Sequence, residues 1–441
     1  MLSPYNQYVI TLVIDRTYKM KNNIIIKTLI TSTIVSSIFW GAQAFAEGEP
    51  LTNLEVKGEI TFFTNRTDLV EAGVYDRYTN EFRKMYPGVT SVKVIGFADY
   101  QGGVRPRMNT GDYGDVVLIL PSVPSEQYGN FYEPLDMYNP DEIYFHDAWS
   151  NEGKMYGVSM GNVVEGLVYN KDVLAEAGVK TPLKTTSELY AASEKIANLN
   201  KIPFYVNFGA QWPLQQWDKY PIVLEGNSGV YEKMLTQDKA FFGDTAYHKS
   251  LSLLKTLIDK GWTEKDLITN SWEESKSILA EGNAGMFYLG NWFIPQVIDR
   301  GISSEKIGFM PIPAGESGEL RAQMNHDWGY AVSKHSKSKP AAKAYIKFIL
   351  EKSDFDELAG FIPTIKAKES TLPQLNEFMS YNPEIIQTPT NSSTFIEVTN
   401  RSQIDFYSGG YIQDVMTAPD FDNALKKLDG RWNRAKKRVI K

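Results

Sequence analysis

Short apolar segments alternate with amphipathic ones in the first part of this chain, and the alternation restricts the fold more than any other feature. Strands are predicted over residues 59–64, 91–95 and 115–120, and the last is apolar enough to be buried on both faces. Residues 74–85 repeat apolar side chains at helical spacing, and residues 99–109 can form a shorter helix. Strand, helix, strand, helix, strand is typical of a parallel α/β sheet.

The same alternation returns in the second half of the chain. Further strands are expected over residues 203–207, 284–289 and 307–310, and further helices over 185–199, 247–258 and 340–350. A length of 441 residues exceeds one compact domain. We therefore predict two α/β lobes, each a mainly parallel sheet flanked by helices.

Residues 20–46 have the three-part pattern of a secretory signal peptide. Lys21 and Lys27 precede an uncharged stretch, and small residues follow up to Ala46, after which cleavage is expected. Translation is then expected to start at Met20. Removal of residues 1–46 would shift the formal net charge from −7 to −10, because the segment holds four basic residues and one acidic residue. An acidic, exported protein is expected, and the charge argues against nucleic-acid binding.

The composition offers little for catalysis or metal binding. The chain has no cysteine and four histidines, which leaves no thiolate ligands and no paired histidines at helical spacing. No nucleotide-binding fingerprint is present, so we expect no metal, no cofactor and no enzymatic activity.

Two enzymatic alternatives stay open at this point. Residues 157–161 match the G-x-S-x-G pattern with Ser159 as nucleophile, but that motif needs a helix directly after the serine, and the following residues favour extended chain. A glycosidase would need two facing carboxylates, for which the sequence gives no positive sign.

Polar and aromatic residues gather at the ends of the predicted strands. Ligands of open α/β sheets bind beyond the carboxyl ends of the strands. The candidates from this pattern are Asn65, Arg66, Asp68, Asp115, Trp212, Asn291, Trp292, Asp327 and Trp328. We interpret Trp149 and Trp262 as structural.

Large aromatic rings beside amides and carboxylates suit a ligand with apolar faces and polar edges. A sugar ring is such a ligand. A polyamine or quaternary ammonium ion, held by cation–π contacts, is the alternative ligand class. Core packing is the competing explanation for any single tryptophan, and the clustering at strand ends favours binding.

Several motifs, in order, resemble the family one extracellular solute-binding proteins, the sugar-binding components of ABC importers. The most specific is the tyrosine-containing segment over residues 166–176, just after 153–158. Residues 114–117, 284–292, 307–315 and 329–333 match further pieces, so the resemblance covers about Leu54 to Arg434.

The resemblance implies a two-lobed, type II periplasmic-binding-protein-like fold with a multi-stranded hinge. Lobe 1 is expected over residues 47–162 plus 329–365, and lobe 2 over 166–325 plus 395–441. The crossings are expected near 161–166, 325–329 and 361–394. It also places Asn162 on a hinge that faces the ligand.

The implied function is capture of a mono- or oligosaccharide between the lobes and delivery to membrane permease subunits. The protein is expected to be a monomer. Two departures from the family pattern are visible. Ser159 stands where proline is frequent, which makes the nucleophile match look accidental, and the cysteine that carries a lipid in many members is absent. We therefore expect a periplasmic or extracellular protein without that lipid.

Overall fold

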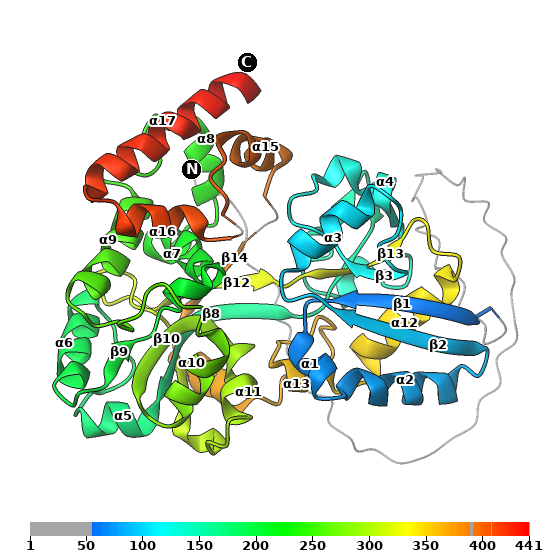
Figure 1. The fold of residues 1–441 in the computed structure, drawn as a ribbon, viewed down its shortest axis with the longest axis horizontal. Helices are drawn as coiled ribbons and strands as arrows, with labels where there is room; N and C mark the ends of the chain where they lie inside the picture. The colour runs from blue at the N-terminus through cyan, green and yellow to red at the C-terminus, as the bar shows by residue number, and fades with distance from the viewer. Residues whose placement is uncertain (1–54, 389–390, 407, 441) are drawn as a thin grey trace, which may run out of the picture. The chain divides into compact units, whose positions relative to one another are not determined.

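The computed structural model describes residues 55–388, 391–406 and 408–440. The predicted signal peptide lies outside these residues. The described chain forms two six-stranded sheets with helices packed around them (Figure 1). The first sheet has the strand order β2-β1-β3-β13-β4, with β7 also paired to β13. The second has the order β14-β12-β8-β10-β9, with β11 also paired to β8.

The first sheet and the elements packed around it come from the chain before β8 and from a later segment that begins with β13. They are β1 (Gly58–Thr64), α1 (Thr67–Glu71), α2 (Val74–Met85), β2 (Val89–Gly96), α3 (Tyr100–Met108), β3 (Val116–Leu118), η1 (Ser125–Gln127), α4 (Tyr128–Phe131), β4 (Tyr132–Glu133), η2 (Pro140–Glu142), β5 (Ser150–Asn151), β6 (Lys154–Met155), β7 (Val158–Ser159), β13 (Gly329–Ser333), α12 (Lys339–Glu351) and α13 (Phe355–Ala359).

The remaining elements form the second sheet or pack around it. They are β8 (Asn162–Asn170), α5 (Lys171–Glu176), α6 (Thr186–Ala197), β9 (Ile202–Phe204), η3 (Phe208–Ala210), η4 (Trp212–Gln215), α7 (Gln216–Glu225), α8 (Val230–Thr236), α9 (Ala246–Asp259), α10 (Trp272–Ala280), β10 (Ala284–Gly290), α11 (Phe293–Ile298), η5 (Ser304–Lys306), β11 (Ile307–Met310), β12 (Arg321–His326), α14 (Pro373–Ser380), β14 (Glu384–Gln387), α15 (Ser393–Ser402), α16 (Gly410–Thr417) and α17 (Phe421–Val439).

The predicted two-lobed α/β fold is confirmed, but the sheets are mixed rather than mainly parallel. β1 runs parallel to β2 and β3, as the alternation predicts. β13 runs antiparallel to β3, β4 and β7. β8 likewise runs antiparallel to β10, β11 and β12. The sequence pattern describes only βαβ units, whereas β8 and β13 enter their sheets directly from the other half of the chain and so run in the opposite direction.

Three buried clusters of apolar side chains hold the sheets and helices together. One belongs to the first sheet, with Phe62, Tyr330 and Tyr345 fully buried at its centre. The other two cover opposite faces of the second sheet, because successive side chains of β8 alternate between them: Leu167 lies in one cluster and Val168 in the other.

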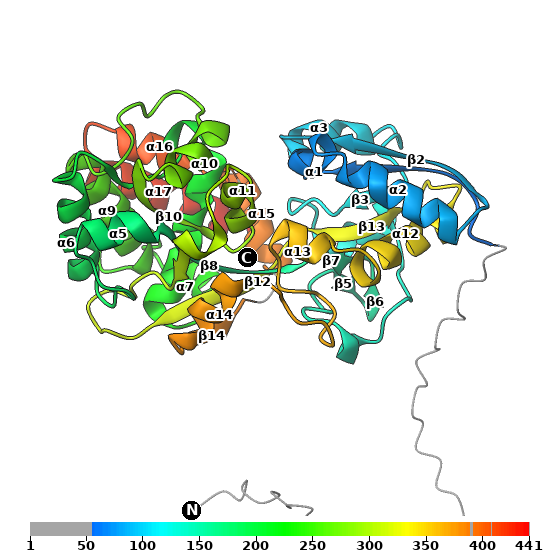
Figure 2. The same cartoon turned by 90° about the horizontal axis from the view of Figure 1, so that it is seen from below.

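The chain passes between the two sheets on three segments that are joined by backbone hydrogen bonds. The Asp327 amide donates to the Gly161 carbonyl over 2.9 Å, and the Met160 amide donates to the Trp328 carbonyl over 2.8 Å. Asn162 and Ile362 exchange two backbone bonds of 2.8 and 3.0 Å. Figures 1 and 2 show β8 and β12 side by side in this region. The segment at Ile362 therefore lies beside the first passage at Asn162. The lobe boundaries and crossings expected from the sequence stay predictions.

No nucleophile elbow is formed at Ser159. β7 ends at this residue and the strand β8 follows, where the motif requires a helix. The hydroxyl is 2% exposed and donates to the Gly161 carbonyl two residues on. In the described part of the chain, no helix has the length and apolar character needed to cross a membrane.

A substitution of Gly329 would test how tightly the start of β13 is packed. A Cβ atom here would lie 2.7 Å from Cε2 and Nε1 of Trp149, which is 4% exposed. Because the indole cannot move without opening the core, Gly329→Ala should lower the free energy of unfolding by about 1–3 kcal/mol. Denaturant unfolding measures this change.

Gly430 of α17 provides the matched control. Its Cβ position is 3.5 Å from the flexible end of Arg434 and meets nothing closer. Gly430→Ala should leave stability unchanged or raise it by up to about 1 kcal/mol, because alanine favours the helix. Equal losses in both variants would contradict the proposed clash.

Candidate functional site

The carboxyl end of β1 is followed by an ion pair between a buried arginine and a half-buried aspartate. Arg66 follows the strand and is 8% exposed, and its Nε and Nη2 donate to the two carboxylate oxygens of Asp68 over 2.8 and 2.6 Å. Burial alone would lower the pKa of Arg66, but the bond to Asp68 raises it overall. Burial alone would raise the pKa of Asp68, and the bond from Arg66 lowers it instead. Two further atoms here, Arg66 Nη1 and Asn65 Oδ1, are buried without a hydrogen-bond partner among the described residues.

Three tryptophans from the second sheet form one aromatic surface. The ring centroids of Trp212 and Trp272 are 4.7 Å apart, those of Trp212 and Trp292 5.7 Å, and those of Trp272 and Trp292 6.0 Å. All three rings are only partly buried. We call Trp212, Trp272 and Trp292 the tryptophan triad.

Trp272 is a residue that sequence reasoning missed. It opens helix α10, whereas the strand-end criterion selects residues that follow strands. Lys276 lies behind its ring, with Nζ 4.9 Å from the ring centroid and 2.8 Å from both carboxylate oxygens of Glu273. The polar sequence just before Trp272, which includes Asn270 and Ser271, is the signal that could have identified it.

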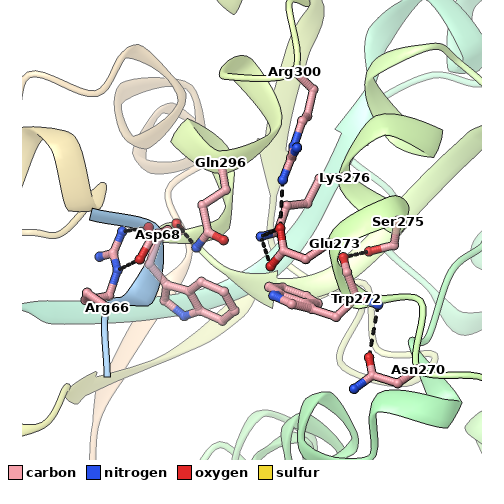
Figure 3. A network of polar contacts seen from close by, with 10 residues as sticks. Arg66, Asp68, Asn270, Trp272, Glu273, Ser275, Lys276, Gln296 and Arg300 are labelled. Carbon is pink, nitrogen blue, oxygen red and sulfur yellow. Dashed lines mark hydrogen bonds and ion pairs between the residues drawn. The ribbon is translucent and has the colours of Figure 1, made fainter. Parts of the chain in front are cut away.

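The triad and the Arg66–Asp68 pair belong to one neighbourhood. Figure 3 shows Arg66 and Asp68 close to Gln296, with Trp272, Lys276 and Glu273 beyond. The Gln296 side chain donates to the Trp292 carbonyl over 3.2 Å. Asp68 and Lys276 interact electrostatically, so the two sheets bring charged groups together here. Trp292 also packs against apolar clusters of both sheets.

The second chain passage adds Asp327 and Trp328. Asp327 accepts from the Trp328 amide over 2.8 Å, and burial raises its pKa. Asp327 interacts electrostatically with Arg66 and with Lys219. The Trp328 ring meets the Tyr100 ring edge-on at 5.3 Å. These residues therefore adjoin the Arg66–Asp68 pair.

A second ion pair, partly buried, joins β8 to α7 and was also missed by sequence reasoning. Glu165 is fully buried, and one carboxylate oxygen accepts from Lys219 Nζ over 2.6 Å. The other oxygen has no partner among the described residues. A single glutamate in an apolar strand predicts a buried charge with a partner, which is the signal that could have found it.

Asn162 begins β8 and lies beside Ile362, where the chain passes between the two sheets. Its expected role at a hinge that faces the ligand stays a prediction. Asn162 is fully buried, and its amide nitrogen donates to the Pro363 carbonyl over 3.1 Å. Its Oδ1 has no hydrogen-bond partner among the described residues. One polar atom of this side chain is therefore engaged by the segment at Pro363, and the other is not.

Two predicted site residues use their polar atoms in contacts within the protein. Asp115 lies at the amino end of β3, where it accepts from the Thr61 amide and the Ser336 hydroxyl over 2.8 and 2.6 Å. The strand-end criterion requires the carboxyl end, so selecting Asp115 was wrong on position. Asn291 is fully buried, accepts from the Val164 amide over 2.8 Å and donates to the Gly360 carbonyl over 2.5 Å. Its side chain links its own segment to β8 and to the segment at Gly360, and both of its polar atoms are used in these bonds.

The family model for bacterial extracellular solute-binding proteins matches residues 66–354. The chain belongs to this family. Family and fold are those of binding proteins. Among the described residues, no three His, Asp or Glu side chains converge as metal ligands.

Individual relatives of this solute-binding protein are distant. A putative binding protein of Brucella abortus is 27% identical over 244 residues, which span 53% of this chain and 58% of that protein. The multiple sugar-binding protein of Streptococcus mutans is 23% identical over 67% of this chain and 71% of its own length. The BlMnBP1 binding protein of an ABC transporter from Bifidobacterium animalis subsp. lactis, solved with mannobiose, is 26% identical and superposes with a TM-score of 0.79. That match covers 88% of this chain and 96% of the solved one.

The role of Asn291 is testable through stability. Asn291→Ala leaves the Val164 amide and the Gly360 carbonyl unpaired in the interior and should lower the free energy of unfolding by about 2–4 kcal/mol. The exposed Asn283, which donates to the nearby Glu281 carboxylate, is the control. Asn283→Ala should change stability by no more than about 0.5 kcal/mol. A similar small change in both variants would contradict the fastening role.

His326 predicts a pH dependence of stability. Burial lowers its pKa from 6.5 to about 4, and its ring packs against Trp149 at 4.7 Å. As the pH falls below 6.5, this histidine is protonated in the unfolded chain before it is protonated in the folded one. The free energy of unfolding therefore decreases from pH 6.5 towards pH 4. In His326→Phe this loss should be smaller by about 2–3 kcal/mol between pH 7 and pH 4.

Denaturant unfolding of both proteins across this pH range checks the prediction. The raised pKa of Asp327 acts with the opposite sign, because protonation of that carboxyl favours the folded state at low pH. Since Asp327 is present in both proteins, the difference between them isolates the histidine. Identical pH profiles would contradict the assignment.

Proposed function

We propose that this solute-binding protein captures an uncharged oligosaccharide between its two lobes and hands it to an ABC importer. The observation that carries the proposal is the tryptophan triad beside the Arg66–Asp68 pair, contributed by different sheets. Trp328 and Asp327 complete the proposed site from the chain passage between the sheets. The relatives cited above, a multiple sugar-binding protein and a protein solved with mannobiose, support a carbohydrate ligand.

The chemistry of a sugar fits both halves of the proposed site. The C–H faces of a pyranose ring pack on aromatic rings, and three adjoining indoles offer more surface than one ring needs. The hydroxyl groups at the edge of the sugar need donors and acceptors. Arg66 Nη1 and Asn65 Oδ1 are polar atoms without partners, and Asp327 adds a carboxyl group.

The pattern of charges favours an uncharged ligand over a polyamine or quaternary ammonium ion. Each cation near the triad already faces a carboxylate: Arg66 faces Asp68, Lys219 faces Glu165, and Lys276 faces Glu273. Binding of a cation would require breaking one of these pairs or bringing a positive charge close to three others. A neutral sugar requires neither.

Binding between two lobes supplies a way to signal occupancy. A ligand that contacts both lobes stabilises the closed state, because only in that state can both lobes contact it at once. The three hydrogen-bonded chain passages allow the lobes to turn about a common line without losing register. Permease subunits in the membrane would then receive the liganded form, and the monomeric protein would act outside the cytoplasm once residues 1–46 are removed.

Substitutions in the tryptophan triad test the sugar site. Trp272→Ala and Trp212→Ala should each weaken binding of a disaccharide or trisaccharide by about 10-fold or more, because each removes part of the stacking surface. Isothermal titration calorimetry against a panel of neutral saccharides, including mannobiose and mannotriose, measures the effect. Absence of binding by every saccharide at millimolar concentration would refute the carbohydrate proposal.

Trp262 is the matched control. Its ring packs against Tyr190 with 5.9 Å between centroids and makes no contact with the triad. Trp262→Ala should reduce stability but retain sugar affinity in the folded fraction. Spermidine in the same titrations separates the ligand classes, since binding of spermidine in competition with a sugar would contradict an uncharged specificity.

A further inference from the structure

The C-terminal helix α17 has a charge opposite to that of the whole chain. Its residues Phe421–Val439 include seven Lys or Arg and two Asp, whereas the full sequence carries a formal net charge of −7. The helix borders α15 and α16 on the second-sheet half of the fold (Figure 1).

One face of α17 is committed to the protein interior. Leu425, Leu428 and Trp432 are buried in the large cluster of the second sheet, and Trp432 Nε1 donates to the Met234 carbonyl over 2.9 Å. Asp429 accepts from the backbone amides of Ala240 and Phe241 over 2.7 and 2.9 Å. The helix is therefore held in place, and its apolar face is not available to insert into anything else.

The outward face of α17 carries a row of cations. Lys427, Arg434 and Arg438 follow one another at spacings of seven and four residues, which places them on one side of the helix. Arg431, between them, is half-buried, and its guanidinium donates to the backbone carbonyls of Ser402 and Gln403. The row is about 16 Å long at 1.5 Å per residue. Lys427, Arg434 and Arg438 are exposed, as is the adjoining Lys437.

These exposed cations are grouped on one helix without acidic partners. Some other helices pair a cation with an acid four residues along, as in Arg77–Glu81, Lys255–Asp259 and Lys347–Glu351. No carboxylate within the described residues forms an ion pair with Lys427, Arg434, Lys437 or Arg438. By contrast, Lys426 and Lys436 are used internally, over the Phe242 ring and on the Gln237 carbonyl.

The helix dipole accounts for only part of this row. Cations in the last turn of a helix are favoured by the partial negative charge there, which covers Lys437 and Arg438. Lys427 lies three turns earlier and gains nothing from that effect, which falls off within one turn. A row of unpaired cations without interspersed acids fits a surface of repeated negative charges better than a single anion.

We propose that the outward face of α17 docks on an anionic phospholipid surface and holds the protein loosely at the membrane. Clusters of four or more basic residues on a helix bind such surfaces electrostatically. Ile440 is 42% exposed directly after Arg438 and Val439, and can enter the headgroup region beside the row. Because the apolar face of α17 is internal, binding is peripheral, reversible and sensitive to salt.

Vesicle sedimentation tests this proposal with the mature protein. Vesicles of phosphatidylglycerol and phosphatidylethanolamine should bind it at low salt, whereas phosphatidylcholine vesicles should not. Binding should fall steeply between about 0.05 and 0.3 M salt as the Debye length shortens. The combined change Lys427→Glu, Arg434→Glu and Arg438→Glu should weaken binding to the anionic vesicles on the order of 100-fold or more.

The matched control carries the same charge change on scattered exposed lysines. Lys93→Glu, Lys180→Glu and Lys260→Glu lie outside α17 and outside the proposed sugar site. This variant should keep most of the vesicle binding, and sugar titration should confirm that both variants fold. Equal losses in the two variants, or equal binding of the wild type to neutral and anionic vesicles, would overturn the proposal. Loss of permease binding by the α17 variant with vesicle binding intact would instead assign the row to a protein partner.

Discussion

Backbone hydrogen bonding between the chain passages is the constraint on which the rest of the structure depends. Every peptide group buried there needs a partner, so passages that run side by side satisfy one another as short strands. Met160 and Gly161 bond with Trp328 and Asp327, and Asn162 bonds with Ile362. A slip of one residue in any passage would break these bonds and turn the neighbouring side chains to the wrong side. The register of the passages therefore sets where Asp327 and Trp328 lie.

The chain passages and the residues next to them also determine the position of the tryptophan triad. Asn291 fastens β8 and the segment at Gly360, so its neighbour Trp292 starts from an anchored backbone. Trp212 and Trp272 then pack against Trp292 and each other. A binding surface of three rings needs such anchoring, since rings held only by loops would lose conformational entropy when a ligand orders them. The proposed site thus depends on Asn291 without any direct contact from that side chain to a ligand.

The sequence predicts some of this arrangement and misses the rest for identifiable reasons. β1, β2, β3 and their helices follow from apolar spacing, and Trp292 from its place after a strand. Asp115 was selected because it adjoins a strand, but it lies at the wrong end, where Thr61 and Ser336 use both of its oxygens. Trp272 begins α10 and Lys219 lies within α7, so a criterion based on strand ends misses both. Their relation to the site comes from contacts with residues such as Trp212 and Glu165, more than fifty positions away.

Charge is distributed unevenly in a way that separates ligand binding from the α17 surface. Near the tryptophan triad, cations and carboxylates are paired, so the local field is small and a neutral ligand meets no net charge. On the outward face of α17, Lys427, Arg434, Lys437 and Arg438 have no ion-pair partner among the described residues, while the excess of acids lies elsewhere. The electrostatic effect of an exposed charge is largely screened beyond about 8 Å at physiological salt. A negative surface therefore repels the protein in most orientations and attracts it only when α17 approaches first. An overall negative charge and attraction to an anionic surface are thus compatible, since only the charges within a Debye length of the surface act on it, and on the outward face of α17 those charges are positive.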